Sequence, residues 1–175
     1  SKFSQSVPII SKKKSLINTY DFKVFNEFLD KNLLTLGFYA SASNSLIGKN
    51  VKLSERRFLP SNKLRGFESG KVGPMDGTDY IGGNYAMSFN IAATIPQILP
   101  NSENTDFSLF IDAANIWGID YNSSINDGST IRSSAGIAVN WYTPIGPLNF
   151  SLSEVLNKHS NDKTESFRFN LGTTF

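Results

Sequence analysis

Few residues in this chain have the types and spacing that catalysis or ligand chemistry would need. The sequence holds one histidine, His159, and no Ser or Asp is arranged around it for nucleophilic or acid–base catalysis. Cysteine is absent, which excludes disulfides and thiolate zinc sites. Gly70-Lys71 lacks the rest of a phosphate-binding loop, and the spacing of Asp76 and Asp79 does not make a calcium loop. We therefore expect no enzymatic activity, no cofactor and no metal.

The remaining candidate is Arg65, in the run Leu64-Arg65-Gly66-Phe67 near the middle of a long loop at residues 44–83. Loops of this length without regular structure are uncommon in compact domains and are usually functional or disordered. A guanidinium taken out of bulk water needs a carboxylate, and its planar fork suits a bidentate pair. Gly66 would let the backbone pass close to a wall. The alternative is that Arg65 is an ordinary solvated loop residue.

The elements that must position this loop are strands. Apolar and polar residues alternate with period two about eight times along the chain, which is the primary sequence signal of a β-strand. In residues 34–43, large apolar side chains alternate with Thr, Gly, Tyr and Ser. The predicted strands cover residues 3–9, 20–28, 34–43, 85–95, 107–117, 134–141, 148–153 and 167–175.

Composition and connections favour strands that cross a membrane. Charged residues make up 18% of the chain, against about 25% in typical soluble domains, and aromatic residues make up 13%. Mean hydropathy is −0.21 and no run reaches the ~20 apolar residues of a membrane helix, but barrel strands alternate and keep this average low. Short connections at 30–32 and 143–147 alternate with longer ones at 44–83, 118–130 and 157–165, as in outer-membrane barrels.

Aromatic side chains also lie where a membrane interface would place them, because Trp117, Trp141 and Tyr142 come near strand ends. We therefore predict an all-β fold, an antiparallel transmembrane β-barrel of about eight strands, in one domain over residues 1–175. The long loop is expected on the outer side of the membrane. The net charge of +2 and the scattered basic residues predict no nucleic-acid partner. The chain begins within a strand, so we expect an upstream portion.

Several motifs occur in the order of a known family. They are 64–67 with Val72-Gly73-Pro74, Gly82-Gly83-Asn84, Phe110-Ile111-Asp112 with Trp117, residues 131–139 running into 143–148, and residues 167–175. On these residues the chain resembles the bacterial surface antigen family of outer-membrane protein assembly factors. The likeness covers most of the chain and is weakest before Leu53.

The resemblance implies that the chain is the C-terminal half of a sixteen-strand barrel, without the periplasmic POTRA domains and the first half of the barrel. It implies a place in the bacterial outer membrane and a function in inserting β-barrel proteins into that membrane without ATP. The partners implied are outer-membrane lipids, unfolded β-barrel clients and the lipoproteins of an assembly complex. Any such activity belongs to the whole protein.

The resemblance also implies two sites. Arg65 would fold into the lumen and pair with Asp112 on the barrel wall, while the position of a second wall acid is occupied by Ala92, which predicts a weaker clamp. The last strand would be the family's β-signal, with Phe167, Phe169, Leu171 and Phe175 on its aromatic side. Its unpaired backbone edge could template a client strand, whereas its aromatic side chains are expected simply to face lipid.

Two other functions remain open. The first is a related outer-membrane pore that translocates proteins or is passive. The second is a soluble β-sandwich or lipocalin-like binding module, which solubility as a monomer without detergent would favour. An eight-stranded barrel has room only for side chains, so a loop of about forty residues packed in a lumen would require strands from elsewhere.

Overall fold

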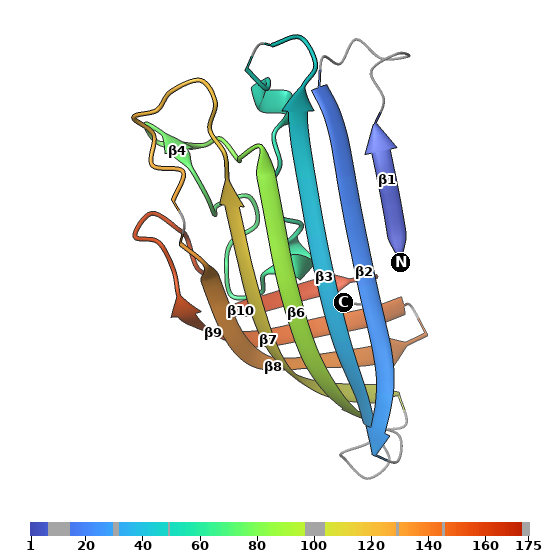
Figure 1. The fold of residues 1–175 in the computed structure, drawn as a ribbon. Helices are drawn as coiled ribbons and strands as arrows, with labels where there is room; N and C mark the ends of the chain where they lie inside the picture. Colours follow the sequence, from blue (N-terminus) through green and yellow to red (C-terminus); the bar gives the residue numbers. More distant parts are fainter. Residues whose placement is uncertain are drawn as a thin grey trace.

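The computed structural model describes residues 1–6, 15–29, 32–48, 50–96, 104–128, 130–144 and 146–172. In these residues the chain forms one antiparallel sheet of eight strands, in which neighbours along the chain are also neighbours in the sheet (Figure 1). The strands are β1 (Lys2–Ser6), β2 (Ser15–Leu29), β3 (Asn32–Ser45), β6 (Tyr85–Pro96), β7 (Thr105–Trp117), β8 (Arg132–Thr143), β9 (Gly146–Asn157) and β10 (Phe167–Leu171). The predicted all-β fold with about eight antiparallel strands is confirmed.

Each predicted segment corresponds to one of these strands, although the ends differ. β2 begins five residues before the predicted start at Tyr20, and β9 continues to Asn157, into the predicted loop. The first and last predicted strands are described only in part, because residues 7–14 and 173–175 lie outside the described residues. The predicted position of Phe175 at the end of the last strand therefore lies outside them too.

The two faces of the sheet have the reverse of the burial expected for a soluble protein. On β7 the apolar residues Leu109 and Ile111 are 57% and 53% exposed, whereas Asp112, on the opposite face of the strand, is fully buried. On β8, Ser134 is also fully buried, while Ile137 is 46% exposed. A sheet that buries its small polar face and presents its large apolar face outward matches the lumen and lipid sides of a membrane barrel.

The long loop covers the polar face from the concave side of the sheet, which Figure 1 shows curled into part of a cylinder. We call residues 50–83 the plug. The sequence predicted neither helix nor strand here, but the plug contains two single-turn 3₁₀ helices and one hairpin whose two strands have two residues each. These elements are η1 (Leu53–Glu55), η2 (Ser61–Lys63), β4 (Met75–Asp76) and β5 (Asp79–Tyr80).

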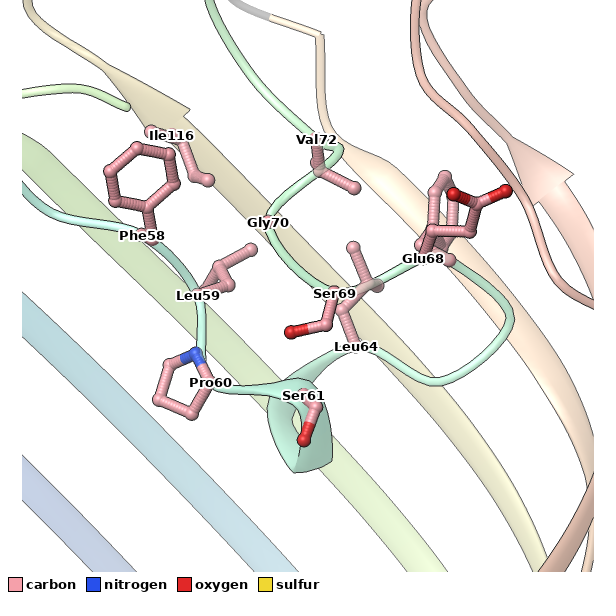
Figure 2. Close-up of a pocket in the computed structure, with 11 residues that line it drawn as sticks. Phe58, Leu59, Pro60, Ser61, Leu64, Glu68, Ser69, Gly70, Val72 and Ile116 are labelled. Carbon is pink, nitrogen blue, oxygen red and sulfur yellow. The ribbon is translucent and has the colours of Figure 1, made fainter. Parts of the chain in front are cut away.

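A small apolar cluster holds the plug against the wall. Leu59, Leu64 and Val72 of the plug point towards Ile116 of β7, as Figure 2 shows. Phe67 belongs to the same cluster and is 1% exposed. The main apolar core of the chain therefore lies between the plug and the concave wall, not between two sheets.

The sheet has two edges that do not meet. Among the described residues, no pairing joins β1 to β10, so the strands form part of a barrel and not a closed one. Within the same residues, no helix has the length and apolar character needed to cross a membrane.

Candidate functional site

The site is built around the contact between Arg65 of the plug and Asp112 of β7. Arg65 Nε donates to Asp112 Oδ2 and Nη2 donates to Oδ1, both at 2.7 Å, and the backbone N–H of Arg65 donates to Oδ2 at 3.0 Å. The Arg65 side chain is 6% exposed and that of Asp112 is 0% exposed. The structure thus brings the two predicted residues together in a bidentate, buried ion pair, the geometry in which Arg–carboxylate pairs are strongest.

Other groups of the wall enclose the Arg65 guanidinium. Its central carbon lies 3.5 Å from the centroid of the Phe110 ring, which is two residues before Asp112 on the same face of β7. The Ser134 hydroxyl of β8 donates to the Arg65 carbonyl. A planar guanidinium can stack on an aromatic ring and hold a carboxylate at once, which the ammonium group of lysine cannot do in the same way.

Gly66 allows the plug to approach the wall at this point. It has φ of +87°, and a Cβ built on it would lie 3.1 Å from Ser153 Cβ and 3.2 Å from Ser134 Cβ. Any other residue would be strained in its backbone and crowded by the wall. The next residue, Phe67, fills the apolar cluster behind the ion pair.

A polar residue of β6 supports the clamp. The residue opposite Asp112 on β6 is Asn90, whereas Ala92, predicted at the position of a second wall acid, lies opposite Phe110. The Asn90 amide donates to Asp112 Oδ1 and to the Lys63 carbonyl, both at 2.9 Å. This neutral amide therefore adds a hydrogen bond to the carboxylate that Arg65 also binds.

A second cation ties the plug to the other side of the sheet. Lys63 Nζ, at the end of η2, lies 2.6 Å from Asp21 Oδ1 on β2 and 5.4 Å from the centroid of the Tyr39 ring on β3. Lys63 is 3% exposed. The plug is thus fixed to β2 and to β7 by two neighbouring cations of its own.

A third contact of the plug involves Arg168 of β10, a residue that the sequence did not single out. Arg168 is 8% exposed. Its Nε donates to Glu165 Oε1 at 2.5 Å, Nη1 donates to the Ser61 carbonyl at 2.5 Å, and Nη2 donates to the Phe67 carbonyl. Two of its acceptors are therefore backbone groups of the plug.

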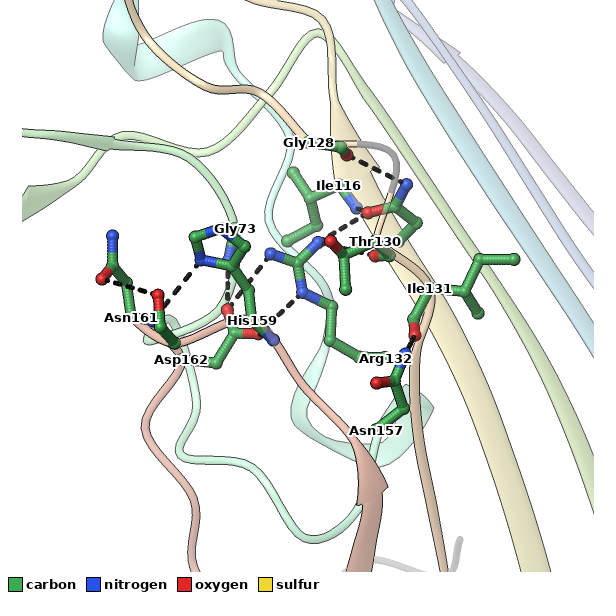
Figure 3. A network of polar contacts seen from close by, with 12 residues as sticks. Gly73, Ile116, Gly128, Thr130, Ile131, Arg132, Asn157, His159, Asn161 and Asp162 are labelled. Atoms are coloured by element: carbon green, nitrogen blue, oxygen red, sulfur yellow. Dashed lines mark hydrogen bonds and ion pairs between the residues drawn. The ribbon is translucent and has the colours of Figure 1, made fainter.

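A separate buried ion pair joins Arg132 of β8 to Asp162 in the loop before β10 (Figure 3). Arg132 Nε lies 2.9 Å from Asp162 Oδ2, and Asp162 also accepts from the backbone N–H groups of Gly73 and His159. His159, the one histidine of the sequence, is half-buried beside this pair. Its ring Nδ1 accepts from the Asn161 N–H at 3.4 Å, so its contacts are structural.

Asp120 holds the start of the plug to the loop after β7. It accepts from the Val51 N–H at 2.8 Å and from the Asn84 amide at 3.0 Å, and it lies 3.4 Å from Arg56 Nη2. Close by, the Tyr121 hydroxyl donates to Asp76, and this hydrogen bond raises the pKa of Tyr121.

Tyr80 of the hairpin shows a similar effect. Its hydroxyl donates to the Asn161 carbonyl, and burial together with the Asp162 carboxylate raises its pKa. The two aspartates considered above for calcium, Asp76 and Asp79, lie opposite each other in the backbone register of the hairpin. In the part of the chain that the structure describes, no group of three or more His, Asp or Glu side chains could hold a metal ion.

The predicted terminal-strand residues lie on the outward face of β10. Phe167, Phe169 and Leu171 are 56%, 50% and 60% exposed. β10 pairs with β9 along one side only, from Phe167 opposite Leu152 to Leu171 opposite Leu148. The site therefore combines a plug clamped inside the sheet with a terminal strand whose other backbone edge carries no strand among the described residues.

Comparisons of sequence and of structure with known proteins point to one family. The sequence matches the Omp85 superfamily domain over residues 3–175. The outer membrane protein assembly factor BamA of Neisseria meningitidis serogroup B is 33% identical over 141 residues, which cover 64% of this chain and 17% of that protein. BamA of Neorickettsia risticii is 28% identical over 131 residues, which cover 73% of this chain and 18% of that protein.

A SAM50-like protein of Schizosaccharomyces pombe is 34% identical over 132 residues, which cover 68% of this chain and 27% of that protein. The crystal structure of BamA from Haemophilus ducreyi lacking POTRA domains 1–3 matches with a TM-score of 0.81 at 27% identity. That match covers 92% of this chain and 35% of the crystallised one. The chain thus spans about a third or less of each of these four proteins.

Proposed function

Since the chain belongs to the Omp85 superfamily, we propose that it is the C-terminal barrel portion of a protein that inserts β-barrel proteins into the bacterial outer membrane. The single observation that carries the proposal is the plug clamped by Arg65 and Asp112 on the polar, concave face of a sheet whose apolar face is exposed. This arrangement suits a lumen on one side and lipid on the other.

The whole barrel needs more strands than the eight described here. An eight-stranded barrel has an interior just wide enough for side chains, and the plug would not fit inside one. We propose that further strands, joined at the free edge of β1, complete a barrel of about sixteen strands with the plug in its lumen. POTRA domains in the periplasm would belong to the same whole protein.

The proposed partners follow from the two faces and the free edge. Outer-membrane lipids would contact the apolar face, and unfolded β-barrel clients would pair with the backbone edge of β10. Lipoproteins of an assembly complex would bind elsewhere on the whole protein. The function proposed is non-enzymatic and uses no cofactor, since strand pairing and burial in lipid supply the free energy of insertion.

A protein-translocating pore is the second candidate, because a plug inside a lumen also suits a channel that opens. The two candidate functions differ in the final location of the client protein. An inserted client remains in the bilayer as a folded barrel, whereas a translocated client crosses it.

The experiment uses the full natural protein reconstituted in liposomes and an outer-membrane barrel protein unfolded in urea. Folding of the client is followed by its protection from protease and its altered mobility in unheated gels. We expect faster folding than in liposomes that hold an equal amount of a passive porin. Equal rates would contradict insertase activity, and a client protected inside the vesicles in soluble form would favour translocation.

A further inference from the structure

The described part of the terminal strand pairs with one neighbouring strand. β10 pairs with β9 over five positions, from Phe167 to Leu171. Two more backbone hydrogen bonds extend this pairing, from the Ser153 N–H to the Ser166 carbonyl and from the Gly172 N–H to the Pro147 carbonyl, both at 2.8 Å. Among the described residues, no strand pairs with the other edge of β10.

The segment just before β10 pairs with the plug instead. The Glu165 N–H donates to the Gly66 carbonyl, the Glu68 N–H donates to the Lys163 carbonyl, and the Lys163 N–H donates to the Lys71 carbonyl, each at 3.0 Å. Phe67 and Thr164 form an antiparallel bridge between these bonds. Backbone pairing thus continues from the plug directly into the chain that enters β10.

Arg168 extends this connection into β10 itself. It is the only charged residue in β10, and its guanidinium binds the Ser61 and Phe67 carbonyls of the plug and the Glu165 carboxylate. The two carbonyls flank the Arg65 position in the chain. A charge-assisted hydrogen bond is stronger than a neutral one, and a buried guanidinium that lost these acceptors would be unsatisfied.

We propose that Arg168 is a positioning residue that couples the terminal strand to the plug, so that the two move as one unit. This inference rests on the proposed function, because it concerns the strand whose edge is proposed to receive clients. The plug is itself fixed to β7 by Arg65 and to β2 by Lys63. The free edge of β10 is then held in place through the plug, and releasing the plug releases the edge.

Coupling between two elements is reciprocal, which makes the proposal measurable from both sides. Loss of Arg168 should loosen β10 and also the plug around residues 61–68. Loss of the Arg65 clamp should loosen the plug and, through Arg168, the strand β10. Once Arg168 is gone, the Arg65 clamp should have a smaller effect on β10, because only the backbone hydrogen bonds before β10 still join that strand to the plug.

The test is amide hydrogen exchange of the full natural protein in lipid nanodiscs. We expect Arg168→Gln to speed exchange in residues 167–171 and 61–68 at least about tenfold, because two charge-assisted hydrogen bonds to the plug are lost. Arg168→Lys keeps the charge but cannot span three acceptors, and should give a smaller rise in the same two segments. If the glutamine variant does not assemble, the lysine variant is interpreted in the same way.

The matched control is Arg56→Gln. Arg56 is a buried arginine of the same plug, 5% exposed, but it pairs with Asp120 in the loop after β7. This variant should leave exchange in residues 167–171 unchanged. A rise there equal to that of Arg168→Gln would mean general damage to the plug and would overturn the specific role of Arg168.

The double variant decides whether there is coupling. Arg65→Ala should speed exchange in β10 when Arg168 is present, and should speed it by a smaller factor in the Arg168→Gln protein. Effects that multiply, or an Arg168→Gln protein with unchanged exchange in β10, would overturn the proposal. Exchange is read without a client, so a protein that inserts no client but shows this pattern would refute the proposed function and leave the coupling standing.

Discussion

At the scale of single residues, buried ion pairs fix where the plug lies. Arg65, Arg132 and Arg168 are all buried, and each pairs with a carboxylate. Replacing a buried ion pair by apolar residues is often neutral, whereas removing one partner is costly because the other charge stays buried and unpaired. These pairs therefore select one position of the plug over alternatives more than they raise the total free energy of unfolding.

The Arg65 clamp gives the first prediction. Arg65→Ala leaves the Asp112 carboxylate buried without its cation, so the full protein should lose about 3–5 kcal/mol of unfolding free energy. Denaturant unfolding in detergent measures the loss. Lys52→Ala, at an exposed lysine of the same plug, should change it by less than about 0.5 kcal/mol. An unchanged unfolding curve for Arg65→Ala would refute the clamp.

Two glycines of the plug separate backbone strain from crowding. Gly66 and Gly70 have φ of +87° and +70°, but only at Gly66 would a Cβ meet the wall. Alanine should cost about 1–2 kcal/mol at either position through the left-handed backbone. At Gly66 it should cost about 1–3 kcal/mol more through overpacking. The same unfolding measurement compares the two variants, and equal losses would mean that Gly66 does not lie against the wall.

At the scale of the elements, each strand separates a polar concave face from an apolar outward face. Among the residues of the eight strands that the structure describes, Glu154 is the only charged side chain on the outward rows. It lies between Leu152 and Leu156, near the end of β9, where a charge costs less than at the middle of a bilayer. The outward face is therefore suited to lipid over most of its height.

Two isoleucines with similar exposure test this face. Ile111 lies in the middle of β7 and is 53% exposed, and Ile131 lies just before β8 and is 61% exposed. In a membrane, Ile111→Arg should cost about 2–4 kcal/mol and Ile131→Arg about 0–1 kcal/mol, since the cost depends on depth. Unfolding of the full protein in lipid measures both. Small and equal costs would support the soluble β-sandwich that the composition left open.

The sequence predicted the strands well because one face of each strand is apolar and the other is polar, which makes the residue types alternate clearly. In β3, leucine, phenylalanine and alanine on one face alternate with threonine, glycine, tyrosine and serine on the other, so the period of two is clear. The family resemblance, which the comparisons confirm, predicted the pairing of Arg65 with Asp112, and the two side chains are in contact in the structure.

The register between strands and the path of the plug could not be predicted from the sequence. The hydrogen bond from Asn90 to Asp112 was not predicted, because the register of β6 against β7 depends on the connection between them, which alternation does not determine. The plug acceptors of Arg168 are backbone carbonyls 101 and 107 residues away. Every residue has a carbonyl, so no side-chain pattern could have marked them.

At the scale of the whole molecule, the plug and the open edges have one common explanation. The concave face holds a plug too large for an eight-stranded barrel, and the edges of β1 and β10 are not joined among the described residues. Both features fit a chain that supplies part of a larger barrel. The match to BamA from Haemophilus ducreyi covers 92% of this chain but only 35% of that one, which agrees with a chain that forms part of a larger barrel.

Spin labels along β7 of the full protein in lipid nanodiscs test this arrangement most directly. The 175 residues contain no cysteine, so a single cysteine can be placed in this chain at Leu109, Ile111 or Ser108. Labels at Leu109 and Ile111 should collide with oxygen dissolved in lipid and be shielded from a water-soluble nickel chelate, whereas a label at Ser108 should be shielded from lipid. If the nickel chelate reaches Leu109 and Ile111 instead, the apolar face is in water and the chain is not the wall of a membrane barrel.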